Sequence, residues 1–187
     1  AREVNFAERG GEKVLVRARN GVVLAYSKDS YNVEFLRDGD NRTDYDSAIY
    51  TEALMKAIEI IEAGGGTTID TSYIRQDPDT GELYYEWGVS SRANQVARYR
   101  NFCEAMGFTI EYDENIKDKA LWDTSQWPTA EESYNKLRAL WFIPEELTFA
   151  EANKIISIRQ EVNLNNYRAY EPITIAYDVS MDVVAQI

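Results

Sequence analysis

The chain has 187 residues and a formal net charge of −12, from 32 acidic and 20 basic side chains. A protein that binds a phosphate backbone directly usually carries the opposite charge, so direct binding of nucleic acid is not expected. Histidine is absent and cysteine occurs once, at Cys103. The commonest general base, most zinc sites and an internal disulfide are therefore excluded, and we predict no cofactor, no metal site and no catalytic residue.

A chain of this length is expected to form one domain over residues 1–187. The alternative is a β-rich half with two helices, residues 1–113, and a second half with a helical hairpin and a terminal strand, residues 114–187. No apolar run reaches the length of about 18 residues that suggests a membrane span. Residues 1–13 lack the apolar stretch of a signal peptide. We therefore expect cytoplasmic synthesis and no membrane partner.

The N-terminal region has the pattern of a β-hairpin. Apolar side chains alternate over residues 13–26 around Asn20 and Gly21, a pair that suits a type I′ turn because both residues tolerate positive φ. A further strand is expected at residues 31–36. Together these segments predict a β-meander.

The middle of the chain predicts helices and strands in mixed order. Apolar residues at spacings of three and four indicate a helix over residues 47–63, which ends at glycines 64–66. In the turn at residues 77–81, Pro78 fixes φ, Asp79 is expected to bond back to the main chain, and Gly81 accepts positive φ. The remaining expected elements are strands at 67–74, 83–89 and 108–112 and a helix at 92–106.

Two capping boxes predict the starts of two further helices. Thr129 is followed three residues later by Glu132, and Thr148 by Glu151. Pro144 separates the two segments. We expect a helical hairpin near residues 129–163.

Residues 173–185 alternate between apolar and mostly polar side chains, which predicts a strand with one buried face. Fully extended, this strand would span about 43 Å, whereas a compact domain of this size is about 40 Å across. We therefore expect it to pair with, or pack on, another chain. The alternative is a strand that bends or breaks within one sheet.

These elements lack a regular βαβ rhythm. They predict an α+β fold with mostly antiparallel sheets, about four helices, the helical hairpin and a long C-terminal strand.

The expected partner-binding segment combines this strand with the aromatic, amide-rich loop before it. Interfaces favour such aromatic side chains as anchors. The partners would be other protein subunits, in a homo- or hetero-oligomer. The expected binding residues are Asn165, Tyr167, Arg168, Tyr170, Ile173, Ile175, Tyr177, Val179, Met181 and Val183.

Two other sets of charged residues could carry chemistry. Arg92, Arg98 and Arg100 make one helix locally basic, which is typical of a charge-complementary face or, less often, an anion site. Paired carboxylates could serve a hydrolase, but no spacing singles out a pair. The acids considered are Glu82, Glu86, Glu111, Asp113 and Glu114.

The first functional hypothesis is a non-enzymatic structural or adaptor subunit of a multiprotein assembly, for example a head, neck or tail component of a phage or virus virion. The second is an acidic inhibitor that mimics nucleic acid in a basic groove. The third is a metal-dependent hydrolase or nuclease that uses only Asp and Glu.

Overall fold

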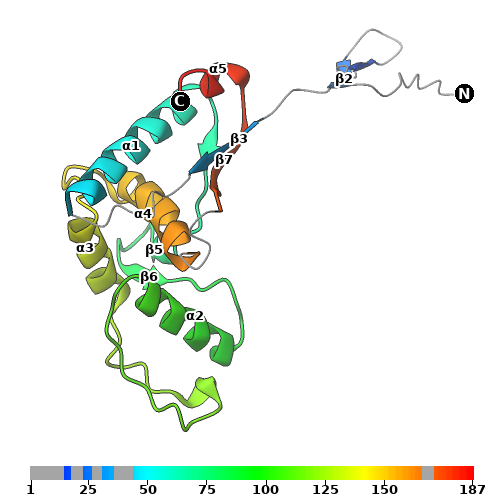
Figure 1. Cartoon of the computed structure of the whole chain (residues 1–187). Helices are drawn as coiled ribbons and strands as arrows, with labels where there is room; N and C mark the ends of the chain where they lie inside the picture. Colours follow the sequence, from blue (N-terminus) through cyan, green and yellow to red (C-terminus); the bar gives the residue numbers. More distant parts are fainter. Residues whose placement is uncertain (1–14, 18–22, 27–30, 36–43, 166–170) are drawn as a thin grey trace, which may run out of the picture.

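The computed structural model describes residues 15–17, 23–26, 31–35, 44–165 and 171–187 (Figure 1). The helices are α1 (Asp44–Ala63), α2 (Arg92–Ala105), α3 (Ala130–Leu140), α4 (Phe149–Leu164) and α5 (Met181–Val184), with a 3-10 turn η1 (Lys119–Leu121). The strands are β1 (Leu15–Arg17), β2 (Val23–Tyr26), β3 (Tyr31–Phe35), β4 (Thr67–Thr68), β5 (Ile74–Gln76), β6 (Leu83–Tyr85) and β7 (Ile173–Val179). All strand pairs are antiparallel, so the expected α+β class is confirmed.

The strands form three small sheets, in the orders β1-β2, β3-β7-β4 and β5-β6. The expected meander is wrong, because β3 leaves the hairpin and pairs with β7, where Val33 lies opposite Ala176. Both residues are buried in the main core, so this long-range pairing buries apolar surface. The predicted turn at Asn20 and Gly21 lies outside the described residues.

The C-terminal strand is present, but it ends at Val179, and its expected extension to residue 185 is wrong. Val33 pairs with Ala176 while Tyr31 pairs with Val179, so β7 holds one extra residue between these pairs. Asp178 lies in this bulge with φ of 57°. A bulge bends a strand and changes the direction of later side chains. The chain then turns into α5, whose helical spacing makes Val183 its buried residue.

The helices supply most of the core, with α4 at its centre. The predicted stripe of α1 is confirmed, with Leu54, Ile58 and Ile61 buried. Both capping boxes are present, at Thr129 with Glu132 and at Thr148 with Glu151. The sequence spacing thus located the two helices of the hairpin correctly.

Two segments that were expected to be continuous strands, residues 67–74 and 108–112, have backbone groups that bond to side chains of other segments. Residues 67–74 split into β4 and the start of β5, because the amides between them bond to α4: Ser72 N donates to Ser157 Oγ at 3.1 Å and Tyr73 N to Gln160 Oε1 at 3.0 Å. Residues 108–112 form no strand. Instead, the Trp127 indole donates to the Glu111 carbonyl at 2.9 Å.

The turn between β5 and β6 forms with a different acid from the one expected. Asp77, not Asp79, bonds back to the main chain, since its Oδ1 accepts from Asp79 N at 2.8 Å and Thr80 N at 2.9 Å. These bonds hold the pKa of the Asp77 carboxyl below its ordinary value. Gly81 has the expected positive φ, 76°. The strand expected at 83–89 ends earlier, with β6 at Tyr85.

In the part of the chain that the structure describes, no helix combines the length and apolar character that crossing a bilayer requires.

Candidate functional site

Four of the expected partner-binding residues precede β7 in the sequence. Tyr167, Arg168 and Tyr170 lie outside the described residues. Asn165 is the C-cap residue of α4, and its Nδ2 donates to the Glu161 carbonyl at 2.9 Å. Its side chain therefore has a structural role at the helix end.

Most of the expected residues on β7 and beyond belong to the core of this chain. Ile175, Val179 and Val183 are each at most 2% exposed, so they cannot contact a partner. Ile173 is half-buried and pairs with Phe35. Only Tyr177 and Met181 of the expected set are well exposed in this segment.

The backbone edges of β7 are also used within the chain. β3 pairs along one edge and β4 along the other, where Ile69 N extends the ladder by donating to the Ile175 carbonyl at 2.9 Å. Pairing of this strand with another chain through main-chain hydrogen bonds therefore does not fit the fold. At β7, contact with a partner would therefore be made by exposed side chains.

The end of β7, α5 and the start of β3 lie near one another (Figure 1), and they carry five apolar residues with exposed side chains. We call them the C-terminal surface. Each is between 36% and 59% exposed. Its members are Tyr31, Tyr177, Met181, Val184 and Ile187.

Three members of the C-terminal surface are not among the expected binding residues, namely Tyr31, Val184 and Ile187. Met181 and Val184 are spaced three residues apart, which is the spacing of one helix face, and Ile187 lies three residues beyond the end of α5. That signal was present in the sequence, but the stronger two-residue alternation obscured it. Tyr31 joins through its pairing with Val179, which the local sequence does not indicate.

The C-terminal surface is held in place by the glycines that follow α1. Gly65, with φ of 78°, ends α1 in a Schellman motif, in which Gly66 N donates to the Ile61 carbonyl at 2.8 Å. Gly64 leaves room for Val183, because a Cβ there would lie 2.1 Å from Val183 Cγ2. Burial of Val183 fixes α5 on the core and turns Met181 and Val184 outward.

The charged side chains of the C-terminal segment are all acidic. Residues 171–187 contain Glu171, Asp178 and Asp182 but no lysine or arginine. Asp178 and Asp182 are exposed beside the apolar side chains. The result is an apolar surface with an acidic rim.

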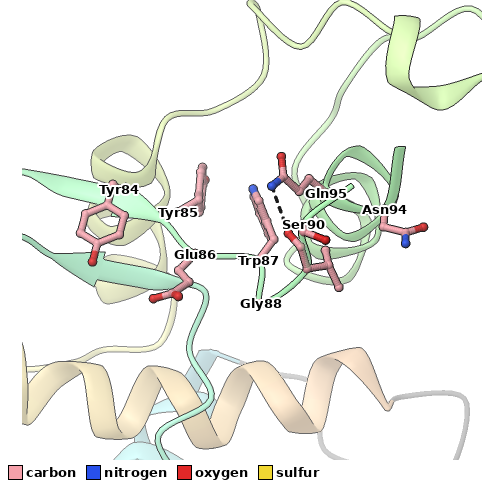
Figure 2. Close-up of a pocket in the computed structure, with 9 residues that line it drawn as sticks. Tyr84, Tyr85, Glu86, Trp87, Gly88, Ser90, Asn94 and Gln95 are labelled. Atoms are coloured by element: carbon pink, nitrogen blue, oxygen red, sulfur yellow. Dashed lines mark hydrogen bonds between the residues drawn. The ribbon is translucent and has the colours of Figure 1, made fainter. Parts of the chain in front are cut away.

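A wide, open hollow of about 930 Å³ lies between the end of β6 and the start of α2 (Figure 2). The Tyr85 and Trp87 rings stack side by side at 4.6 Å, and Gln95 Nε2 donates to the Val89 carbonyl at 3.0 Å. Glu86 is the one carboxylate in the lining, among amides, hydroxyls and rings.

Among the described residues, the carboxyl groups with clearly displaced pKa values lie in turns and helix caps. The pKa values of Asp77, Asp123 and Glu151 are all lowered, in each case by hydrogen bonds within a turn or helix cap. A catalytic general acid would need a raised value. Among the described residues, no three or more acidic or cysteine side chains converge to hold a metal ion.

Comparison with known proteins gives no match, either to a family model or to a curated protein sequence.

Proposed function

We propose that this chain is a non-enzymatic structural or adaptor subunit of a multiprotein assembly, such as a virion, and that it docks through the C-terminal surface. The observation that carries this proposal is an apolar surface fixed to the core by Val183 and Gly64. Tyrosine and methionine are enriched at protein interfaces. Tyr177 and Met181 would act as the central anchors.

The N-terminal hairpin supports the same proposal. Among the described strands, β1 and β2 pair only with one another, and Figure 1 draws β2 away from the helices. An isolated two-stranded hairpin is at best marginally stable in water. A partner that covers it would supply the missing packing.

The charges of the C-terminal surface support a basic partner. The acidic rim at Asp178 and Asp182 would repel the same surface of a second copy, and each copy carries a net charge of −12. A basic protein with an apolar segment at the centre of its contact would meet both features. We therefore assign the C-terminal surface to a different, basic subunit.

The test uses a defined probe, a synthetic amphipathic helix made of leucine and lysine. The matched probe replaces each leucine by serine, so the charge is unchanged. Fluorescence anisotropy compares both peptides with the intact chain and with the triple variant Tyr177→Ser, Met181→Ser and Val184→Ser. Leu121→Ser is the control variant, because Leu121 is 70% exposed and lies on η1.

We expect the intact chain to bind the leucine peptide more tightly than the serine peptide. The triple variant should bind the leucine peptide about tenfold more weakly than the intact chain does. The Leu121 variant should bind it as the intact chain does. Equal binding of both peptides by the intact chain, or equal loss in both variants, would contradict the proposal. Light scattering measures the mass of the chain in solution. Concentration-dependent dimers that the triple variant abolishes would show that a second copy binds the C-terminal surface, and would overturn the proposal of a basic partner.

A further inference from the structure

A small basic pocket is lined by residues of α2 and of the segment around η1. In Figure 1 α2 and α5 lie at opposite ends of the helical part of the chain. The volume of the pocket is about 250 Å³, and its lining includes three cations, Arg100, Lys117 and Lys119, with one acid, Glu114. Three cations together are unusual on a chain with a net charge of −12. The pocket therefore differs in charge from the protein as a whole.

The pocket has an ordered aromatic floor. The Tyr112 and Trp122 rings stack at 4.4 Å with an interplanar angle of 19°, and the Arg100 guanidinium lies 5.9 Å from the centre of the Tyr112 ring. The Trp122 indole donates to the Ile116 carbonyl at 2.9 Å. These contacts hold the pocket in shape without a ligand, which lowers the entropy cost of binding.

The segment that carries the two lysines is also fixed. Asp118 caps η1 by accepting from Ala120 N at 3.0 Å, so Lys117 and Lys119 lie on either side of an ordered residue. Among the described residues, the one hydrogen bond of Lys117 Nζ is long, 3.4 Å, to the Glu114 carbonyl. Both ammonium groups thus keep donors for a ligand.

The guanidinium of Arg100 is incompletely paired. Its Nε is buried and has no hydrogen-bond partner among the described residues, and the nearest carboxylate oxygen, Glu104 Oε1, is 3.6 Å away. A buried donor without a partner costs free energy. The other two arginines of α2 are engaged elsewhere, since Arg92 donates to Thr124 Oγ1 and Arg98 to the Trp87 carbonyl.

We propose that this pocket binds the oxyanion of a phosphate group, free or as a monoester, through Arg100, Lys117 and Lys119. Within the lining itself three cations face a single carboxylate, that of Glu114, so a bound anion would offset an excess of positive charge inside the pocket. Charge-assisted hydrogen bonds from guanidinium and ammonium groups to phosphate are among the strongest in proteins. The assignment is independent of the docking function of the C-terminal surface.

The experiment titrates the full chain with inorganic phosphate while NMR follows the Arg100 Nε–H and Trp122 indole signals. Sodium chloride at equal ionic strength is the reference titration. Adenosine monophosphate is a second arm. The test variant is Lys117→Gln with Lys119→Gln, and the matched variant is Lys56→Gln with Lys154→Gln, which removes the same charge from α1 and α4.

We expect saturable shifts of both signals with phosphate, and about tenfold weaker binding or more in the Lys117 and Lys119 variant. The matched variant should bind as the parent chain does. Binding of adenosine monophosphate with similar affinity identifies the phosphate group as the recognised unit, and its failure restricts the site to the free anion. Shifts no larger than those with chloride, or equal weakening in both double variants, overturn the proposal.

Discussion

Gly64 and Val183 occupy complementary space: a Cβ at position 64 would lie 2.1 Å from Val183 Cγ2. The residue in this turn that has a positive φ is Gly65, so backbone conformation does not explain the glycine at position 64. Its function is therefore to admit the buried side chain of α5. The C-terminal surface depends on this contact, because Val183 is the buried residue of α5.

The first prediction is that Gly64→Ala destabilises the protein. The added methyl group must displace Val183 or α5, and overpacking of this kind costs about 1–3 kcal/mol in the free energy of unfolding. Urea unfolding followed by circular dichroism measures the change. The variant should also expose more apolar surface near α5, seen as increased binding of a hydrophobic dye.

A double-mutant cycle tests the cause. Val183→Ala alone should cost about 2 kcal/mol because it removes buried methyl groups. In that background Gly64→Ala should change stability by no more than about 0.5 kcal/mol, because the clash is gone. Additive effects of the two substitutions would show that Gly64 has another role.

Local patterns predicted the helices well. The stripe of α1 and the two capping boxes depend on residues three or four positions apart, so the pattern that predicts each helix lies within one short segment. Thr129 and Thr148 are N-caps as expected. The strands were predicted less well, because strand pairing depends on partners far away in sequence. The β3–β7 pair joins residues near position 33 to residues near position 176.

The contrast between local patterns and long-range pairing also explains why only part of the candidate site was predicted. Tyr177 and Met181 are exposed, as a partner-binding role requires, but Ile175, Val179 and Val183 are buried inside the chain. The apolar alternation in the sequence runs from residue 173 to residue 185. In the structure, β7 has a bulge at Asp178 and ends at Val179, and α5 follows. A bulge leaves little trace in the hydrophobic pattern, and the glycines that receive α5 are more than a hundred positions away.

The second prediction concerns Phe142, which ends α3 with φ of 53° and is 49% exposed. Phe142 occupies the C′ position of a Schellman motif. The bond that defines this motif runs from Ile143 N to the Arg138 carbonyl at 2.9 Å. Glycine is the usual residue here, since the left-handed region costs other residues roughly 1–2 kcal/mol. Phe142→Gly should therefore raise the free energy of unfolding by about 0.5–1 kcal/mol, after the larger unfolded-state entropy of glycine is included.

Phe142→Ala separates backbone strain from loss of the ring. Alanine keeps the unfavourable φ and removes the ring, so it should be less stable than the glycine variant by about 1 kcal/mol. Thermal unfolding of both variants gives the comparison. Equal stabilities would mean that φ at this position relaxes and stores no strain.

The third prediction concerns Gln160, a fully buried polar residue of α4. Its Nε2 donates to the Thr71 carbonyl at 2.9 Å, and its Oε1 accepts from Tyr73 N at 3.0 Å. Gln160→Leu preserves most of the volume but leaves both backbone groups unpaired. We expect a loss of about 2–4 kcal/mol, measured by urea unfolding.

Gln76→Leu is the matched control for this substitution. Gln76 is exposed, and its one bond, from Nε2 to the Gly81 carbonyl at 3.1 Å, can be replaced by water. Its change should stay within about 0.5 kcal/mol. Similar losses at positions 76 and 160 would attribute the effect to the leucine side chain and not to the buried hydrogen bonds.

The last prediction is a loss of stability at alkaline pH. Burial raises the pKa of Tyr85 and Tyr99 above the ordinary value of 10.0, and it raises the pKa of the Cys103 thiol from 9.0 to about 12. In the unfolded chain these groups lose their protons at the ordinary values, whereas the folded chain still holds them. The unfolded state then binds fewer protons, so the free energy of unfolding must fall as pH rises above 9.

Urea unfolding between pH 8 and pH 12 tests this sign. The stability that the Cys103 thiol contributes is complete below its unfolded pKa of 9.0 and is lost as pH rises toward about 12. Cys103→Ala should therefore flatten the decline in that interval, even though it lowers stability at every pH by removing buried volume. A decline that starts at the same pH with the same slope in the variant would show that the thiol contributes nothing to it. A rise in stability above pH 9 would contradict the burial of all three groups.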